Sequence, residues 1–212
     1  MFDFQQNNPY HAYDVFGHTV HAIKQCNSDD LVVKLAVFFH DFGKPHSYQD
    51  GEDGIRHFKG HGKVSAEITD SIMKRLRFDN ETRNNVVELV YYHDATFEVG
   101  KKYVKRWLNK IGEKQFRRLL EVRRADIKGQ KTDYEKSRIE KVDNIEKILE
   151  EILAEKSCFL LKDLTVNGND VKEVMKLKEG KDIGYWLNEI LKRVIDGELE
   201  NNRDDLVYWM TG

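Results

Sequence analysis

Residues 27–46 read NSDDLVVKLAVFFHDFGKPH, which contains the start, the body and the end of one apolar helix. The hydroxyl of Ser28 can cap free backbone N–H groups of the first turn, and the two acids after it complement the positive end of the helix dipole. Gly43 and Pro45 form the stop signal. Between these signals Lys34 is the one polar residue of the helix body, so we expect the helix to be buried on nearly all sides.

The same helical periodicity covers most of the chain, and the predicted fold class is all-α. Apolar residues recur at spacings of three, four and seven, whereas no run shows convincing strand alternation. We expect helices over residues 13–26, 29–41, 61–77, 82–93, 99–111, 113–129 and 133–156, followed by three shorter helices after residue 168.

The composition predicts a soluble globular protein with a sizeable core. Charged residues make up 34% of the 212 residues and hydrophobic residues 40%, with a mean hydropathy of −0.68. No run approaches the ~20 apolar residues of a membrane span. The start MFDFQQNNPY has neither the basic region nor the apolar region of a secretory signal peptide. Cys26 and Cys158 form no metal or redox spacing, and the net charge of −2 gives no global attraction to nucleic acid. We therefore expect a cytoplasmic protein without membrane association.

The helix of residues 29–41 ends on His40 and Asp41, which places a histidine and a carboxylate at the end of a buried element. An ionised carboxylate without a partner is costly in an apolar interior, and a metal ion is one way to compensate it. Four further polar residues share helix faces with apolar side chains. They are His18, His61, His93 and Asp126.

Taken singly, each of these residues is better explained as a hydrogen-bonded core histidine or as an aspartate in a cap or a salt bridge. Their coincidence on five helices favours one shared metal site instead. Imidazole and carboxylate ligands without thiolate suit Mn, Fe, Ni, Co, Mg or Zn, and the sequence does not distinguish among these metals.

Several motifs carry a resemblance to a known family. The order H, HD, D on successive helices is formed by His18, by His40 and Asp41 within FFHDFGKP, and by Asp126 within RRADIKGQ. The segments HFKGHGKVSAEI at 57–68 and VVELVYYHD at 86–94 accompany them. In these motifs the chain resembles the HD-domain metal-dependent phosphohydrolases.

Two longer segments narrow the resemblance. Residues 8–23, NPYHAYDVFGHTVHAI, resemble the HD portion of bacterial tRNA nucleotidyltransferases of the CCA-adding and poly(A) polymerase superfamily, and residues 163–210 resemble the tail domain of these enzymes. The resemblance implies an HD-domain helical core over 1–130, a connecting amphipathic helix over 131–160 and a small C-terminal helical module over 161–212. From its residues alone, the module is either a packing element or an RNA contact. The nucleotidyltransferase head needs a Gly-Ser turn and an Asp-x-Asp pair, which these residues lack, so we expect no nucleotide addition by this chain alone.

The resemblance implies a metal-dependent phosphohydrolase, either a phosphomonoesterase or a phosphodiesterase, acting on a nucleotide, a 2',3'-cyclic nucleotide or an RNA 3' end. A divalent metal lowers the pKa of water toward neutrality and neutralises charge on the developing phosphate oxygens. By the resemblance, one metal is held by His18, His40, Asp41 and Asp126. A second is held by His61 and His93 with Asp41 as the bridge, and the choice between one metal and two stays open at this point.

Residues near these ligands are candidates for catalysis and substrate binding. Asp41 and Lys44 are the predicted catalytic residues, where Lys44 either holds a substrate phosphate as a point charge or is a solvated loop lysine. His57 and Asp94 are candidates for contacting substrate, for orienting the metal ligands or for protonating the leaving oxygen. The alternative for each is a structural role.

A basic segment surrounds Asp126. Residues 101–131 contain 12 Lys or Arg and three acids, which form either a solvated helix face or a surface that attracts phosphate. Arg123 precedes Asp126 by three positions and is expected to face the metal and bind substrate phosphate. Arg124 precedes it by two and is expected to point away.

A function of a different class is a noncatalytic RNA-binding partner, in which the basic segment and the C-terminal module hold tRNA for a separate nucleotidyltransferase. The presence of every expected ligand favours hydrolysis over this alternative. The sequence does not predict the oligomeric state.

Overall fold

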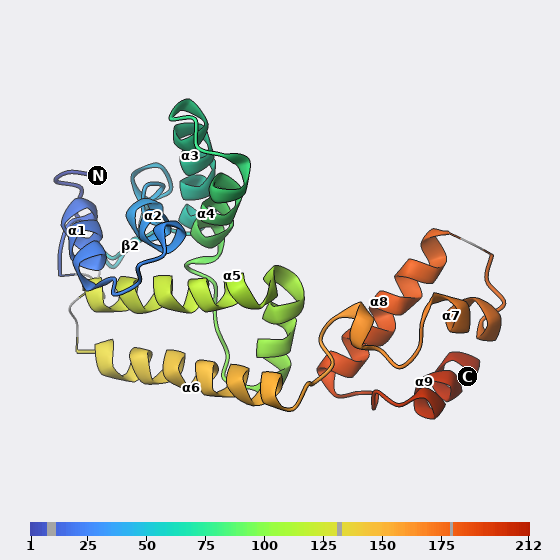
Figure 1. Cartoon of the computed structure of the whole chain (residues 1–212). Helices are drawn as coiled ribbons and strands as arrows, with labels where there is room; N and C mark the ends of the chain where they lie inside the picture. Colours follow the sequence, from blue (N-terminus) through green and yellow to red (C-terminus); the bar gives the residue numbers. More distant parts are fainter. Residues whose placement is uncertain (8–11, 131–132, 179) are drawn as a thin grey trace. The chain divides into compact units, whose positions relative to one another are not determined.

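The computed structural model describes residues 1–7, 12–130, 133–178 and 180–212, and these are mostly helical (Figure 1). The predicted all-α class is therefore confirmed. The α-helices are α1 (Val15–Gln25), α2 (Leu31–Phe39), α3 (His61–Arg75), α4 (Asn80–Tyr92), α5 (Lys101–Gln130), α6 (Glu135–Ala154), α7 (Gly168–Val174), α8 (Lys181–Asp196) and α9 (Arg203–Thr211). Two short 3-10 helices, η1 (Lys44–His46) and η2 (Leu161–Asp163), are also present. Residues 8–11 of the N-terminal motif, Lys131 of the basic segment and Glu179 of the C-terminal motif lie outside the described residues.

The helices begin and end close to the predicted positions, with a difference in the cap of α2. Its N-cap residue is Asp30, whose carboxylate accepts a hydrogen bond from the backbone N–H of Val32 at 2.8 Å. Ser28 Oγ instead accepts from the N–H of Asp30 at 3.3 Å. The predicted helices 99–111 and 113–129 form the single element α5, which is interrupted at Gly112, where φ is 77° and ψ is 164°.

A short antiparallel hairpin of β1 (Gln49–Asp50) and β2 (Arg56–His57) is absent from the predicted elements. Each strand has two residues, too few for a period-2 pattern to show in the sequence. The turn between them contains Gly54 with φ at 75°, a backbone conformation that glycine adopts without steric cost. The hairpin matters here because it brings Arg56 and His57 to the rim of the site described below.

Contacts between residues divide the chain into two compact units. Unit 1 consists of residues 1–97 and 113–146, and unit 2 consists of residues 98–112 and 147–212. The predicted domain boundaries after residues 130 and 160 follow motifs rather than contacts, and they stay a prediction.

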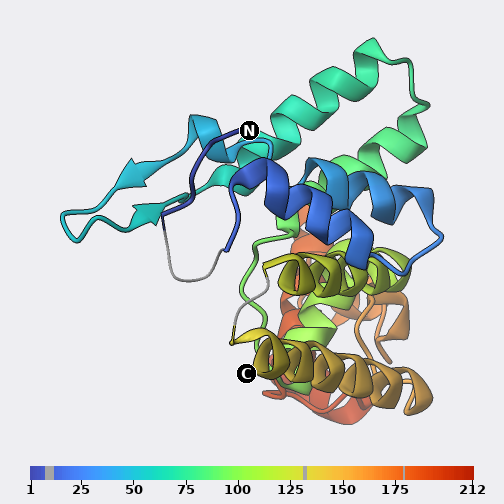
Figure 2. The ribbon, with the colours of Figure 1, turned by 90° about the vertical axis from the view of Figure 1, so that its left-hand side faces the viewer.

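In unit 1, α3 lies against α4, α2 lies against α4, and α1 lies against α2 (Figure 1 and Figure 2). Two glycines permit close approaches that position the site. A Cβ on Gly129 of α5 would lie 2.8 Å from the backbone N and Cα of Ala22 in α1. A Cβ on Gly43 would lie 2.5 Å from the backbone oxygen of His61 and the backbone nitrogen of Ser65 in α3. The first contact fixes α1 on α5, and the second fixes the end of α2 on α3.

Apolar side chains that the sequence places on inward faces fill the cores of both units. In unit 1 they include Val15, Ala22, Val33, Val37, Met73, Leu89, Phe116 and Leu120. In unit 2, α8 buries Ile190, Leu191, Val194 and Ile195, and Leu187 packs against them partly buried. No helix in the described parts of the chain combines the length and the apolar character that a membrane crossing needs.

Candidate metal centre

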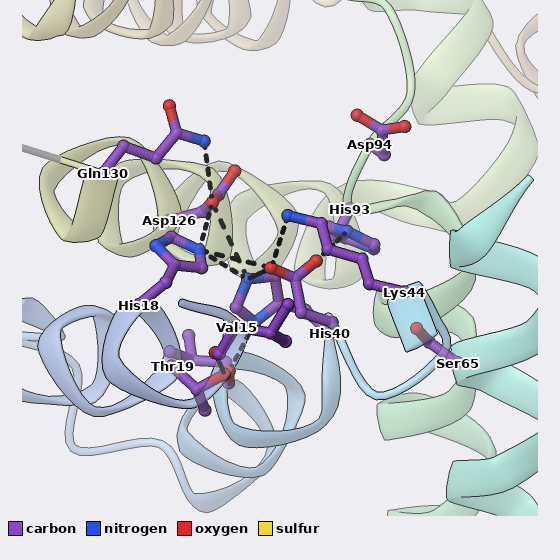
Figure 3. A network of polar contacts seen from close by, with 12 residues as sticks. Val15, His18, Thr19, His40, Lys44, Ser65, His93, Asp94, Asp126 and Gln130 are labelled. Carbon is purple, nitrogen blue, oxygen red and sulfur yellow. Dashed lines mark hydrogen bonds and ion pairs between the residues drawn. The ribbon is translucent and has the colours of Figure 1, made fainter. Parts of the chain in front are cut away.

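The six residues predicted as metal ligands meet in one buried cluster of unit 1. Figure 3 shows four of them, His18, His40, His93 and Asp126. None of the six is more than 7% exposed. They come from five helices or helix ends: His18 from α1, His40 and Asp41 from the end of α2, His61 from the start of α3, His93 from the end of α4, and Asp126 from α5. The structure therefore brings the whole predicted set together.

The helices themselves fix the orientation of three imidazole rings. In His40, His61 and His93, Nδ1 lies 2.7 Å from the backbone carbonyl oxygen three residues earlier in the chain. A carbonyl oxygen only accepts, so Nδ1 carries a proton and donates it, and in the neutral ring Nε2 keeps its lone pair. Histidines that bind metals commonly make this contact, because it fixes the ring and leaves the other nitrogen free for the ion.

The Nε2 atoms point inward in two pairs. In the first pair, Nε2 of His18 and Nε2 of His40 lie 3.0 Å apart. In the second pair, Nε2 of His61 and Nε2 of His93 also lie 3.0 Å apart.

Asp41 joins the two pairs. Its Oδ2 lies 3.4 Å from His18 Nε2 and 3.2 Å from His40 Nε2. Its Oδ1 lies 3.4 Å from His61 Nε2 and 3.7 Å from His93 Nε2. One carboxylate thus faces each histidine pair with a different oxygen.

Asp126 belongs to the first pair alone. Its Oδ1 lies 3.1 Å from His18 Nε2 and 3.7 Å from His40 Nε2. Figure 3 shows Asp126 above the ring of His18, with Gln130 on its other side. Gln130 Nε2 donates to Asp126 Oδ1 at 3.1 Å, which holds the carboxylate in place.

Both carboxylates are ionised despite their burial. Burial favours the neutral form of Asp41, but the charges of His40 and Lys44 outweigh it and hold the pKa of that carboxyl well below its usual value. Burial also opposes the charge of Asp126, whose pKa is nevertheless held well below its usual value by the hydrogen bond from His18 and the charge of His40. Burial lowers the pKa of His40 as well, but the two carboxylates reverse this and raise it.

A divalent metal ion fits this set of donors. The Nε2 lone pairs of His61 and His93 face each other at 3.0 Å and repel unless a positive group lies between them. Two ligand atoms that are each ~2.1 Å from one ion can lie up to ~4.2 Å apart, so the observed separation suits a shared ion. One ligand atom from each of His18, His40 and Asp41 lies within 4.8 Å of the others, and the same holds for Asp41, His61 and His93. When the imidazoles are neutral, as metal ligation requires, the two buried carboxylates face only the ammonium of Lys44, and a cation compensates the remaining negative charge. Burial also lowers the pKa of His93, which favours the neutral imidazole that binds metals.

Lys44 is buried, with 4% of its surface exposed, so the interpretation as a solvated loop lysine is wrong. Its Nζ lies 2.8 Å from Asp41 Oδ2 and donates to Gln6 Oε1 at 2.7 Å. The ring of Phe58 lies 5.2 Å below the ammonium. Lys44 therefore brings its charge directly to the carboxylate that the two histidine pairs share.

A cavity of about 330 Å³, the metal cavity, opens over the cluster. Asp41, His61, His93 and Asp126 contribute to its lining. Its basic lining residues are Lys44, Arg56, Lys59 and Arg138. An anionic ligand such as a phosphate is the kind of molecule that this lining favours.

His57 and Asp94 line the metal cavity without entering the cluster. His57 is exposed on β2. The Asp94 side chain is 63% exposed, and its Oδ2 lies 3.7 Å from His61 Nδ1. Figure 3 shows Asp94 set apart from the ring of ligands.

The two neighbouring arginines of α5 point to different sides of the helix, but Arg123 does not line the metal cavity as expected. Arg123 donates to the backbone carbonyl of His93 at 2.6 Å, and its guanidinium lies 5.3 Å from the centre of the Phe97 ring. It lines a neighbouring cavity rather than the metal cavity itself. Arg124 turns to the other side, where it pairs with Glu121, Asp143 and Glu146.

Besides the cavity-lining residues Arg56 and Lys59, three residues of the hydrogen-bond network around the cluster are missing from the sequence-based set. Gln6 contacts Lys44, Gln130 contacts Asp126, and Arg138 of α6 donates to Gln130 Oε1. Gln130 follows Asp126 by four positions, and this spacing is a signal that the sequence offers. Gln6 reaches the site from 38 positions before Lys44, and Arg138 reaches it from the following helix, α6. No local pattern indicates either residue.

A family model described as tRNA nucleotidyltransferase domain 2 matches residues 48–210, which is more than half of the chain. The chain belongs to this family. The match to tRNA nucleotidyltransferase domain 2 includes His61, His93 and Asp126 and begins after Asp41. The predicted link to the tRNA nucleotidyltransferase superfamily is thus confirmed, while the resemblance to HD-domain phosphohydrolases stays a prediction.

Two curated relatives are similar to this family member. The A-adding tRNA nucleotidyltransferase of Deinococcus radiodurans is 31% identical over 109 residues, which are 49% of this chain and 25% of that protein. The CC-adding tRNA nucleotidyltransferase of Thermus thermophilus is 28% identical over 188 residues, which are 86% of this chain and 41% of that protein. The chain therefore spans less than half the length of either relative. No solved structure gave a significant match.

Proposed function

We propose that this member of the tRNA nucleotidyltransferase domain 2 family is a metal-dependent phosphohydrolase. The observation that carries the proposal is the Asp41 carboxylate, which faces one histidine pair with each oxygen. The first pair, Asp41 and Asp126 would hold one divalent metal, and the second pair with Asp41 would hold another. Two-metal sites of this kind are typical of enzymes that displace an oxygen of a phosphate ester.

When bound, the metals would supply Lewis acidity to the phosphoryl oxygens and lower the pKa of water. The residues of the chain hold the site in place and receive the substrate. Lys44 keeps the Asp41 carboxylate between the pairs and presents positive charge to the metal cavity, where a phosphate gains from it. Asp94 is exposed at the same cavity and is the carboxylate best placed to exchange a proton with the leaving oxygen.

The proposed substrate is a nucleotide, a 2',3'-cyclic nucleotide or the phosphate at an RNA 3' end. The basic lining of the metal cavity supports a phosphate ester. Both relatives are tRNA nucleotidyltransferases, which supports an RNA-related substrate.

A noncatalytic tRNA-binding partner is the second candidate function. The similarity to the Thermus thermophilus enzyme covers 86% of the chain, so it is not confined to the metal cluster. In unit 2 the side chains of Tyr185 and Tyr208 are 62% and 82% exposed, and exposed aromatic rings can stack on the bases of single-stranded RNA.

One experiment separates the two functions. The protein is assayed with added Mn, Fe, Ni, Co, Mg or Zn on p-nitrophenyl phosphate, bis-p-nitrophenyl phosphate, nucleotides and 2',3'-cyclic nucleotides, and tRNA binding is measured by gel shift in the presence of a chelator. We expect metal-dependent hydrolysis of at least one class. His40→Ala should abolish it, while the matched variant His46→Ala, at an exposed residue outside the cluster, should not. Absence of hydrolysis with every metal, together with a chelator-resistant tRNA shift, would favour the binding partner instead.

A further inference from the structure

A second cavity of about 270 Å³, the outer cavity, adjoins the metal cavity in unit 1. The two cavities share Asp94 and Arg138 in their linings. The other cations of the outer cavity are Arg123 and Lys141, so three basic side chains face it against the single carboxylate of Asp94.

The two guanidinium groups of the outer cavity are hydrogen-bonded to neutral oxygens. Arg123 donates to the backbone carbonyl of His93, and Arg138 donates to the side-chain carbonyl of Gln130. No ion pair joins either group to a carboxylate among the residues that the structure describes. Elsewhere in unit 1 the pattern is different, since Arg118 is paired with Asp30.

Arg123 in particular has unused capacity for an anion. Its Nε is buried and makes no hydrogen bond in the described structure. Burial lowers the pKa of Arg123 against the opposing charges of Asp126 and Asp94, and the like charge of Arg138 acts in the same direction as burial. An anion in the outer cavity would supply the missing acceptor and relieve the repulsion between the two guanidinium groups.

The remaining wall of the outer cavity is apolar. Phe97, Ile127 and Ile145 are almost fully buried and line it beside the cations. A cationic side next to an apolar wall suits a nucleoside with its phosphate better than an inorganic ion, because the sugar and the base have faces to bury.

We propose that the outer cavity binds the nucleotide next to the reacting phosphate, so that the preferred substrate is the end of an oligonucleotide rather than a mononucleotide. Arg123, Arg138 and Lys141 would hold its phosphodiester, and the apolar wall would receive the nucleoside. The assignment rests on the proposed function only in placing the reacting phosphate in the metal cavity.

Equilibrium binding to the purified protein in a chelator tests this without turnover. The probes are adenosine 3'-phosphate, the dinucleotide adenylyl-adenosine 3'-phosphate, and ADP, which has a second phosphate but no second nucleoside. We expect the dinucleotide to bind about 10-fold or more tightly than adenosine 3'-phosphate, as a charge-assisted hydrogen bond provides, and ADP to gain less. Lys141→Ala should reduce the preference for the dinucleotide by about 2- to 5-fold, the range for an exposed charge, and Arg123→Ala should reduce it further.

Lys136→Ala is the matched control, because Lys136 is an exposed lysine of the same helix that does not line the outer cavity. Equal affinity for mononucleotide and dinucleotide, or the same loss of preference in the Lys136 and Lys141 variants, would overturn the proposal. A preference equal for ADP and the dinucleotide would overturn the role of the apolar wall and leave a site for a second phosphate. If the binding preference is found but no metal supports hydrolysis, the proposed function fails and the outer cavity stands. If hydrolysis occurs without the binding preference, the proposed function stands and the assignment of the outer cavity fails.

Discussion

Replacing Gly129 with alanine adds one methyl group where α5 meets α1, and we expect it to weaken both the fold and the first half of the metal centre. The added carbon would lie 2.8 Å from N, Cα and Cβ of Ala22, whereas ordinary contacts begin near 3.4 Å. Two of these three atoms belong to the backbone, so no side-chain rotation relieves the overlap and the helices must separate. Overpacking of this kind costs ~1–3 kcal/mol, and alanine returns ~1 kcal/mol through its higher helix propensity.

Gly184→Ala is the matched control for this prediction. Gly184 is also a helical glycine, but a Cβ there would meet no atom within 4 Å. Both variants gain the same helix propensity, so the difference between their unfolding free energies isolates the overpacking and should be ~1–3 kcal/mol. In a protein of this size that corresponds to ~2–4 °C in melting temperature for each kcal/mol.

The same variant should affect the two halves of the metal centre differently. His18 lies on α1 and Asp126 on α5, with 3.1 Å between His18 Nε2 and Asp126 Oδ1, so separation of the helices disturbs the first pair. His61 lies at the start of α3 and His93 at the end of α4, so the proposed metal of this second pair should stay bound. Calorimetry of both glycine variants measures their stability, and metal titration measures how many ions each variant binds. Equal stability and equal metal binding in the two variants would refute the reasoning.

Three further predictions use other parts of the chain. If wild type holds two metal ions per chain as proposed, His93→Ala should leave about one, as measured by elemental analysis, whereas His46→Ala should leave the count unchanged. An unchanged count in both variants would assign His93 a structural or substrate-binding role. Arg124→Ala removes ion pairs to three acids and should lower the free energy of unfolding, measured in urea, by up to ~1 kcal/mol, with a smaller effect at high salt. A large fall in the turnover of a small substrate would contradict the placement of Arg124 away from the metal centre. Burial raises the pKa of the Cys158 thiol to about 11, so this thiol stays protonated at pH 8. Alkylation of the folded protein at pH 8 should therefore label Cys26 first, and equal labelling of the two cysteines would show that Cys158 is not buried.

The sequence predicts the helices well because their signals are local. The acids before Leu31, the apolar run of α2 and the stop at Gly43 lie within one short stretch. The inward histidines follow from helical spacing in the same way. The inward orientation that these residues share predicts that five helices converge on one centre, and the structure supplies the contacts that spacing cannot give.

Features that depend on contacts between different segments of the chain could not be predicted from the sequence. The hairpin that carries Arg56 has strands of two residues. The sequence leaves Lys44 as either a phosphate-binding or a solvated lysine, and only the contacts to the carboxylate of Asp41 and the amide of Gln6 show that it is buried. Arg138 lies on an otherwise ordinary amphipathic helix, and only packing places it at both cavities.

The metal content of the purified protein tests the central claim most directly. Wild type, His40→Ala and Asp41→Ala are prepared without chelator, checked for folding by circular dichroism, and analysed for Mn, Fe, Co, Ni, Zn and Mg. We expect wild type to carry about two divalent ions per chain and both variants to lose metal, with Asp41→Ala losing the most because its carboxylate serves both histidine pairs. Equal metal content in wild type and both folded variants, or no divalent metal in wild type even after reconstitution, would contradict a metal centre at this cluster.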